Sequence, residues 1–98
     1  MKKVILVHGW GGQARGGWFD LLKREFKNKN FKIIAEDMPD TQNPKIDFWI
    51  NKLKKDAGEI DKETYFIGHS IGSQTIMRFL EKLPTDKKIG GAVFVAGW

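Results

Sequence analysis

Ser70 stands in the middle of a G-x-S-x-G pattern, Gly68-His-Ser-Ile-Gly72, whose residue types could carry nucleophilic chemistry. An apolar run at 65–67 precedes the pattern, and an amphipathic helical pattern begins directly after it. A serine at a sharp turn from strand to helix projects clear of the backbone, and the free N–H groups of the helix favour the negative charge that its attack creates. The context therefore predicts a nucleophile elbow with Ser70 as the nucleophile. An ordinary turn from strand to helix is the structural alternative.

A reacting serine also needs donors for the oxyanion and a base that accepts its proton. We expect the donors to be the backbone N–H groups of Ile71, next to the serine, and of Trp10, in a glycine-rich loop. His8 lies at the tip of the first predicted strand and is the candidate for a substitute base. A hydrogen bond within its own loop is the structural alternative for this ring. His69 is less suited, because adjacent side chains on a tight turn usually diverge.

The acid and the base of a catalytic triad are missing from this chain. In G-x-S-x-G hydrolases the nucleophile is followed in the sequence by Asp or Glu and then by His. After Ser70 the acidic residues are Glu81, inside a predicted helix, and Asp86, in a turn at the opposite end of the sheet, and no histidine follows. The sequence therefore predicts a serine nucleophile with an incomplete triad.

The segments that must position these residues alternate between strands and helices. Apolar runs predict strands at 3–7, 31–35, 65–67 and 89–96. Helical periodicity predicts helices at about 18–26, 44–57 and 71–83. The residues expected on their buried faces are Trp18, Leu21, Leu22 and Phe26; Ile46, Trp49, Ile50, Leu53 and Ala57; and Ile76, Phe79, Leu80 and Leu83. This alternation predicts an α/β fold, a three-layer sandwich around a four-stranded parallel sheet in the order 2-1-3-4.

Length and composition narrow the class of protein. The 98 residues suffice for a single domain, 1–98, and the net charge of +5 comes from lysines scattered along helices and turns. Scattered charge is typical of a solvated surface, so we expect no nucleic-acid partner. The chain has no cysteine, and its apolar start is too short for a signal peptide or a membrane span. We therefore expect a cytoplasmic protein without a membrane partner, and with no cofactor and no metal.

Dinucleotide binding is one alternative function. Gly9-Trp-Gly-Gly-Gln-Ala14 satisfies G-x-G-x-x-A after a strand, and Glu36 ends the second strand where a ribose-binding acid would lie. Gly16 and Gly17 interrupt the helix that should hold the pyrophosphate.

A non-catalytic interaction module is the other alternative. The last predicted strand is almost wholly apolar, and no helix follows it before Trp98. A long apolar strand at the edge of a sheet invites pairing, so self-association through this strand is expected. Phe48 and Trp98 are the aromatic residues expected to be exposed.

Four segments together resemble the small α/β-hydrolase family of retinoblastoma-binding-protein-nine-like serine hydrolases. They are His8-Gly-Trp10, Asp37-Met-Pro-Asp40, Gly68-His-Ser-Ile-Gly72 and Gly91-Ala-Val-Phe-Val-Ala96. The similarity runs through all 98 residues, which correspond to about the amino-terminal half of such a protein. The resemblance implies a partial α/β-hydrolase fold, Ser70 as nucleophile, Trp10 and Ile71 as oxyanion donors, and small ester or amide substrates. The family's catalytic Asp and His lie on later strands that have no counterpart in this sequence.

Overall fold

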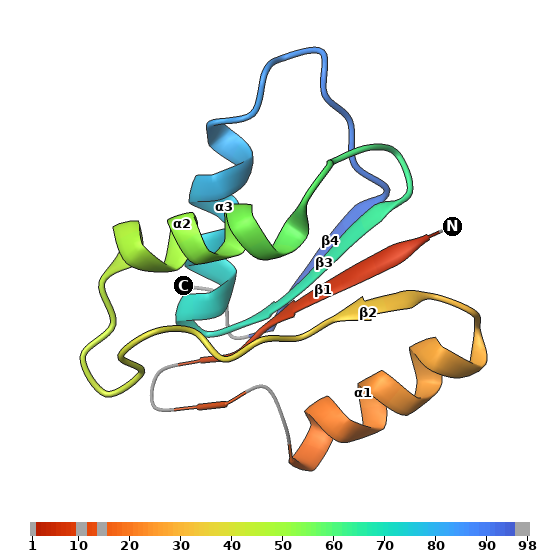
Figure 1. Cartoon of the computed structure of the whole chain (residues 1–98), viewed down its shortest axis with the longest axis horizontal. Helices are drawn as coiled ribbons and strands as arrows, with labels where there is room; N and C mark the ends of the chain where they lie inside the picture. Colours follow the sequence, from red (N-terminus) through yellow and green to blue (C-terminus); the bar gives the residue numbers. More distant parts are fainter. Residues whose placement is uncertain (1, 10–11, 14–15, 96–98) are drawn as a thin grey trace.

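Strands and helices alternate along the residues that the computed structural model describes, which are 2–9, 12–13 and 16–95 (Figure 1). In chain order the elements are β1 (Lys3–Val7), α1 (Gly17–Asn28), β2 (Lys32–Ile34), α2 (Ile46–Ala57), β3 (Thr64–His69), α3 (Ile71–Glu81) and β4 (Gly91–Val95). The predicted alternation is confirmed, and most strands and helices begin and end within one or two residues of the predicted positions.

The strands form one parallel sheet in the order β2-β1-β3-β4, which confirms the predicted order. β1 lies in the interior of the sheet and pairs with β3 from Lys3 opposite Thr64 to Val7 opposite Gly68. Parallel strands in this register end at the same edge of the sheet. The loop after β1 therefore begins beside the turn that follows β3.

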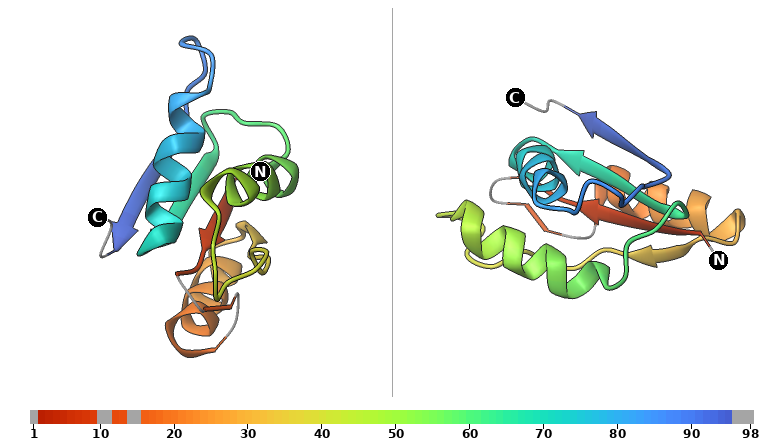
Figure 2. Two further views of the ribbon diagram at one scale, coloured as in Figure 1. Left: turned by 90° about the vertical axis from the view of Figure 1, so that its left-hand side faces the viewer. Right: turned by 90° about the horizontal axis from the view of Figure 1, so that it is seen from above.

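Helices cover both faces of this sheet, as expected for a three-layer sandwich (Figure 2). Helices α2 and α3 pack on one face, where Trp49, Phe66 and Ile76 are fully buried. Helix α1 packs on the other face, against Val4 and Leu6 of β1. Within the described ranges, none of the helices is both long and apolar enough to cross a membrane.

The buried faces of α2 and α3 agree with the predicted periodicity. Trp49, Ile50, Leu53 and Ala57 are buried in α2, and Ile46 packs against the same cluster. In α3, Ile76 and Phe79 are buried and Leu80 is partly buried against the core, as is Leu83, which follows the end of the helix.

The predicted face of α1 is wrong at Leu21, whose side chain is 52% exposed. Phe19 is buried instead, and Leu22 and Phe26 pack against the same cluster. Phe19, Leu22 and Phe26 are three and four residues apart and share one side of a helix, whereas Leu21 is turned about 200° from Phe19. The side chain of Trp18 lies outside what the structure describes.

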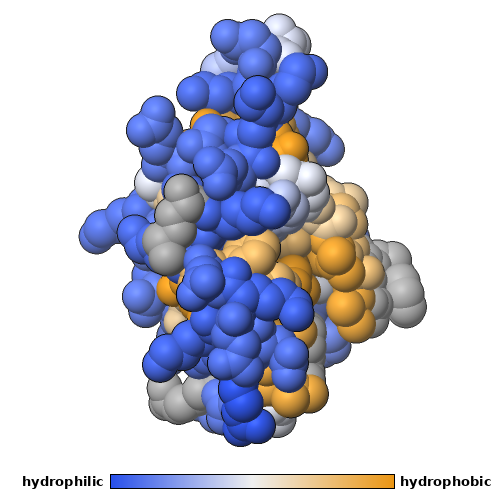
Figure 3. All heavy atoms as spheres, turned by 90° about the vertical axis from the view of Figure 1, so that its right-hand side faces the viewer, coloured by the Kyte–Doolittle hydropathy of each residue, from blue (hydrophilic) through white to orange (hydrophobic). Residues whose placement is uncertain are grey.

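Strand β4 forms one edge of the sheet, and the apolar side chains of its last three residues are exposed. Val93, Phe94 and Val95 are 56%, 39% and 42% exposed. Successive residues of a strand point to opposite faces, so apolar side chains are exposed on both faces of β4. Apolar atoms gather on the side of the molecule where β4 forms the edge (Figure 3). Phe48 is also exposed, as predicted, and Trp98 lies outside the described residues.

Candidate active site

Ser70 is the single residue between the end of β3 at His69 and the start of α3 at Ile71. Its backbone has φ 57° and ψ −123°, a conformation with positive φ that residues other than glycine rarely adopt. Its N–H donates to the carbonyl oxygen of Val95 at 2.9 Å, and its own carbonyl accepts the N–H of Ser73 at 2.9 Å. The strained turn is thus held from β4 and from the first turn of α3, and Ser70 remains half-buried rather than enclosed.

The two glycines of the G-x-S-x-G pattern are required by close backbone contacts. A Cβ on Gly68 would lie 2.8 Å from the Cα and the amide nitrogen of Ser73. A Cβ on Gly72 would collide with the carbonyl oxygens of Val7 and His8. Helix α3 can therefore start against β3 and β1 only because both positions lack a side chain.

The loop after β1 reaches the same turn through Gly9. A Cβ on Gly9 would come within 2.9 Å of His69 Nδ1 and 3.2 Å of Ser70 Cβ, so the backbone of this loop lies directly against the serine. Ile71 is the first residue of α3, and its N–H has no acceptor within the helix. Trp10, the other predicted oxyanion donor, lies outside the described residues.

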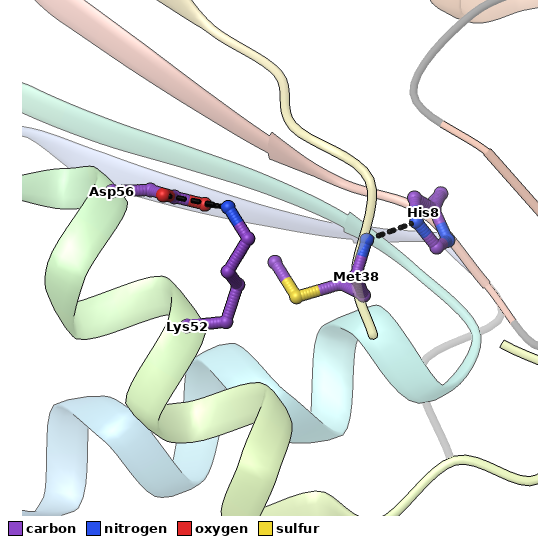
Figure 4. Close-up of polar contacts among 4 residues, drawn as sticks. All are labelled: His8, Met38, Lys52 and Asp56. Atoms are coloured by element: carbon purple, nitrogen blue, oxygen red, sulfur yellow. Dashed lines mark hydrogen bonds and ion pairs between the residues drawn. The ribbon is translucent and has the colours of Figure 1, made fainter. Parts of the chain in front are cut away.

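The surroundings of His8 do not suit its predicted role as a substitute base. The ring is only 1% exposed, and both of its nitrogens are engaged: Nδ1 lies 2.9 Å from Gly9 O, and Nε2 accepts the N–H of Met38 at 2.9 Å (Figure 4). A general base must hold a free lone pair within hydrogen-bond reach of the proton that it takes. Because both nitrogens of His8 are already engaged, neither has a free lone pair for the proton of Ser70. We therefore correct the assignment: the geometry supports the structural alternative for His8.

The sequence reasoning missed two neighbours of this histidine. Met38 is buried, and its backbone N–H donates a hydrogen bond to His8. The indole of Trp49 meets the imidazole edge to face at 5.3 Å, and its Nε1–H donates to Pro39 O at 2.8 Å. The Met-Pro-Asp segment is part of the family resemblance, so the sequence does mark this region. The hydrogen bond between a backbone amide and a distant side chain, however, leaves no pattern in the sequence.

The acidic residues after Ser70 lie away from it. Glu81 ends α3, which begins next to Ser70, so about 15 Å of helix separates them. Asp86 is exposed in the segment between α3 and β4. Among the residues that the structure describes, His, Asp and Glu side chains do not gather in a group of three that could hold a metal ion.

The geometry near Gly9 opposes the dinucleotide alternative. Residues 12–13 are not helical, and α1 begins only at Gly17, after Gly16 with φ 85°. In the dinucleotide fingerprint the helix starts within the glycine motif, so that its amino end can hold the pyrophosphate.

A profile of the serine hydrolase family matches residues 4–98. YdeN from Bacillus subtilis (strain 168) is 30% identical over 97 residues, which cover 99% of this chain and 51% of YdeN. Serine hydrolase RBBP9 from Rattus norvegicus is 29% identical over 82 residues, which cover 81% of this chain and 44% of that protein.

The crystal structure of the ydeN gene product from B. subtilis superimposes with a TM-score of 0.93 at 28% identity, over all of this chain and 53% of the other. The chain thus spans about half the length of the relatives it matches. The alternating fold, its strand order and these matches agree, and the chain belongs to the serine hydrolase family, among the small α/β-hydrolases that resemble RBBP9.

Proposed function

We propose that this chain is the nucleophile-bearing part of a serine hydrolase, in which Ser70 attacks ester or amide bonds of small substrates. The observation that carries the proposal is the backbone of Ser70, held at φ 57° between β3 and α3. A strained turn of this kind is the geometry of a nucleophile elbow, which presents a hydroxyl at the carboxyl edge of a parallel sheet. Family membership favours the same chemistry.

The proposed reaction has two halves. Ser70 Oγ attacks the substrate carbonyl and passes its proton to a base, and the oxyanion lies at the N–H groups of Ile71 and Trp10. As this intermediate collapses, the base returns the proton to the leaving alcohol or amine, and an acyl group stays on the serine oxygen. Water then attacks the acyl group with the help of the base, the acyl group leaves as a carboxylic acid, and the serine hydroxyl is regenerated.

The acid and the base of this triad are proposed to come from polypeptide outside residues 1–98. The chain has two histidines. Both nitrogens of His8 are engaged, and His69 directly precedes Ser70 on the tight turn. The curated relatives are about twice as long as this chain, which leaves room in them for both groups. On this proposal the 98-residue chain alone reacts slowly or not at all.

The test joins residues 1–98 to the half of YdeN that the chain does not match and measures the hydrolysis of p-nitrophenyl acetate. The Ser70→Ala variant is expected to lose activity about 1,000-fold or more, since removal of the nucleophile disables the whole triad. Ser73→Ala is the matched control, one turn further along α3, and is expected to retain activity. An equally active Ser70→Ala variant would remove Ser70 from the mechanism.

Self-association is the second proposed function, and the exposure of β4 favours it. Val93, Phe94 and Val95 are exposed on a strand that, within the part of the chain that the structure describes, pairs with β3 and with no other strand. A second copy could add its own β4 antiparallel to this edge, which would give a two-fold symmetric dimer. Size-exclusion chromatography with light scattering is expected to show a dimer that Val93→Lys converts to a monomer. A wild-type chain that stays monomeric at high concentration would contradict this function.

A further inference from the structure

The imidazole of His8 occupies a junction between two loops at the carboxyl edge of the sheet. It follows β1 directly, and it is bonded to Gly9 in its own loop and to Met38 in the loop after β2 (Figure 4). The ring is 1% exposed and packs edge to face on Trp49. Burial of a polar ring costs free energy unless both of its nitrogens form hydrogen bonds, and both nitrogens of His8 do.

The partners of the ring fix which nitrogen carries the proton. The backbone N–H of Met38 can only donate, so Nε2 at 2.9 Å must accept and carries no hydrogen. A neutral imidazole has one N–H, which is therefore on Nδ1 and donates to the carbonyl oxygen of Gly9 at 2.9 Å. Neither the opposite tautomer nor the charged ring could keep both bonds.

The carbonyl of Gly9 connects this ring to the candidate nucleophile. It also accepts the N–H of Gly12 at 3.0 Å. The same Gly9 backbone lies against the elbow, where an added Cβ would come to 3.2 Å from Ser70 Cβ. The hydrogen bond of His8 to Gly9 therefore acts on the segment that leads into Trp10, the proposed second oxyanion donor.

We propose that His8 is a positioning residue of the active site: its neutral ring, protonated on Nδ1, ties the oxyanion loop after β1 to the loop after β2 and holds Gly9 against Ser70. This role rests on the proposed function, because the loop that it positions is the one expected to bind the oxyanion. His8 itself does not touch the reacting atoms. The same ring that was considered as a base thus acts through the backbone that it fixes.

The first measurement is a long-range ¹H–¹⁵N correlation spectrum of the 98-residue chain with ¹⁵N-labelled histidine. His8 is expected in the neutral form with the proton on Nδ1 and a bare Nε2. A ring protonated on Nε2, or a mixture of the two tautomers, would overturn the proposal. The measurement requires no enzymatic activity, so an unreactive Ser70 would sink the proposed function without affecting this result.

Two conservative variants separate the two bonds. The amide of His8→Asn reaches the position of Nδ1 and can still donate to Gly9, whereas the amide of His8→Gln reaches the position of Nε2 and can still accept from Met38. Hydrogen exchange of the Met38 amide is expected to accelerate about tenfold in His8→Asn and to stay near wild type in His8→Gln. The Ser70 and Ile71 amide signals are expected to shift in His8→Gln and to be restored in His8→Asn.

His8→Phe and Trp49→Phe complete the series. His8→Phe keeps the volume and the ring contact but loses both bonds, so both effects are expected together. Trp49→Phe keeps a ring beside His8 and both hydrogen bonds of His8, while it removes the bond to Pro39 and part of the buried ring volume, so Ser70 and Ile71 are expected to keep their signals. The proposal is overturned if the Ser70 and Ile71 signals of folded His8→Phe and His8→Gln coincide with wild type, or if Trp49→Phe shifts them as strongly.

Discussion

The amide of Ser70 donates a hydrogen bond of 2.9 Å to the carbonyl oxygen of Val95, so the turn that carries the candidate nucleophile is tied to the end of β4. This bond crosses from the end of the third strand to the edge strand, whose outer side pairs with no other strand among the described residues. A backbone N–H at a strained turn needs such a partner, because an unsatisfied amide would add to the cost of the positive φ. The position of the candidate nucleophile therefore depends on an edge strand that contains none of the proposed catalytic groups.

Ser70→Gly is expected to be more stable than Ser70→Ala by about 1 kcal/mol, because glycine relieves a backbone strain of about 1–3 kcal/mol and loses part of the gain to its larger unfolded-state entropy. Both variants lack the hydroxyl, so the comparison isolates the backbone. Urea unfolding followed by tryptophan fluorescence gives the difference. Lys55, on the exposed side of α2, is the control, because glycine should be the less stable variant in an ordinary helix. Lys55→Gly is expected to be about 1 kcal/mol less stable than Lys55→Ala. A Ser70→Gly variant no more stable than Ser70→Ala would contradict the strained turn.

Gly72→Ala is expected to destabilise the chain by about 3 kcal/mol or more, because the new methyl group meets the backbone carbonyls of Val7 and His8. Backbone atoms of an interior strand cannot move aside as a flexible side chain can. Gly91→Ala in β4 is the matched control, since its Cβ would make ordinary contacts of 3.6 and 3.7 Å with the Tyr65 ring. Thermal unfolding by circular dichroism should show a large loss for Gly72→Ala and little change for Gly91→Ala. Equal losses would mean that α3 does not approach β1 as closely as described.

The periodicity of α2 and α3 could be predicted from the sequence because each helix offers one continuous apolar stripe. Helix α1 was ambiguous, because four of the five residues at 18–22 are apolar and allow two overlapping faces: Trp18, Phe19, Leu21 and Leu22. The face that contains Phe19 is the buried one because it packs against Val4 and Leu6 of β1. Such tertiary contacts cannot be read from the local sequence of the helix.

Ser70 could be recognised as a candidate nucleophile because a local pattern surrounds it. The bonding of His8 could not be recognised in the same way. Its acceptor bond comes from the backbone amide of Met38, 30 residues away, and any residue type except proline presents such an amide. The sequence narrowed the role of His8 to two alternatives, and the burial of the ring distinguishes between them.

Ser73→Ala is expected to be neutral or stabilising, whereas Thr75→Val is expected to cost about 1 kcal/mol. Both hydroxyls are buried in α3, but Thr75 Oγ1 donates to Ile71 O at 2.9 Å, while Ser73 Oγ has no partner among the described residues. Removal of an unsatisfied hydroxyl removes its desolvation penalty, and removal of a satisfied one loses a bond. Chemical unfolding of the two variants in parallel checks the order. A Ser73→Ala variant less stable than Thr75→Val would show that the serine hydroxyl has a partner.

Lys3→Met is expected to destabilise the chain by about 1 kcal/mol, because the ammonium of Lys3 donates to the carbonyl oxygens of Ala57, at 2.6 Å, and of Glu59. A cation there also interacts favourably with the carboxyl end of the α2 dipole. Methionine keeps most of the apolar stem and removes only the donors. Lys62→Met is the control, since Lys62 is exposed in the segment before β3. If both variants unfold at the same urea concentration, the hydrogen bonds that link Lys3 of β1 to the end of α2 contribute nothing to the free energy of unfolding.

The central claim is tested most directly by locating a covalent adduct. The chimera of residues 1–98 with the unmatched half of YdeN, and the 98-residue chain alone, are incubated with a fluorophosphonate probe, digested and mapped by mass spectrometry. We predict a single adduct on Ser70 of the chimera, absent from its Ser70→Ala variant, and little or no adduct on the chain alone. An adduct on another residue of the 1–98 segment, with Ser70 unmodified, would contradict Ser70 as the nucleophile.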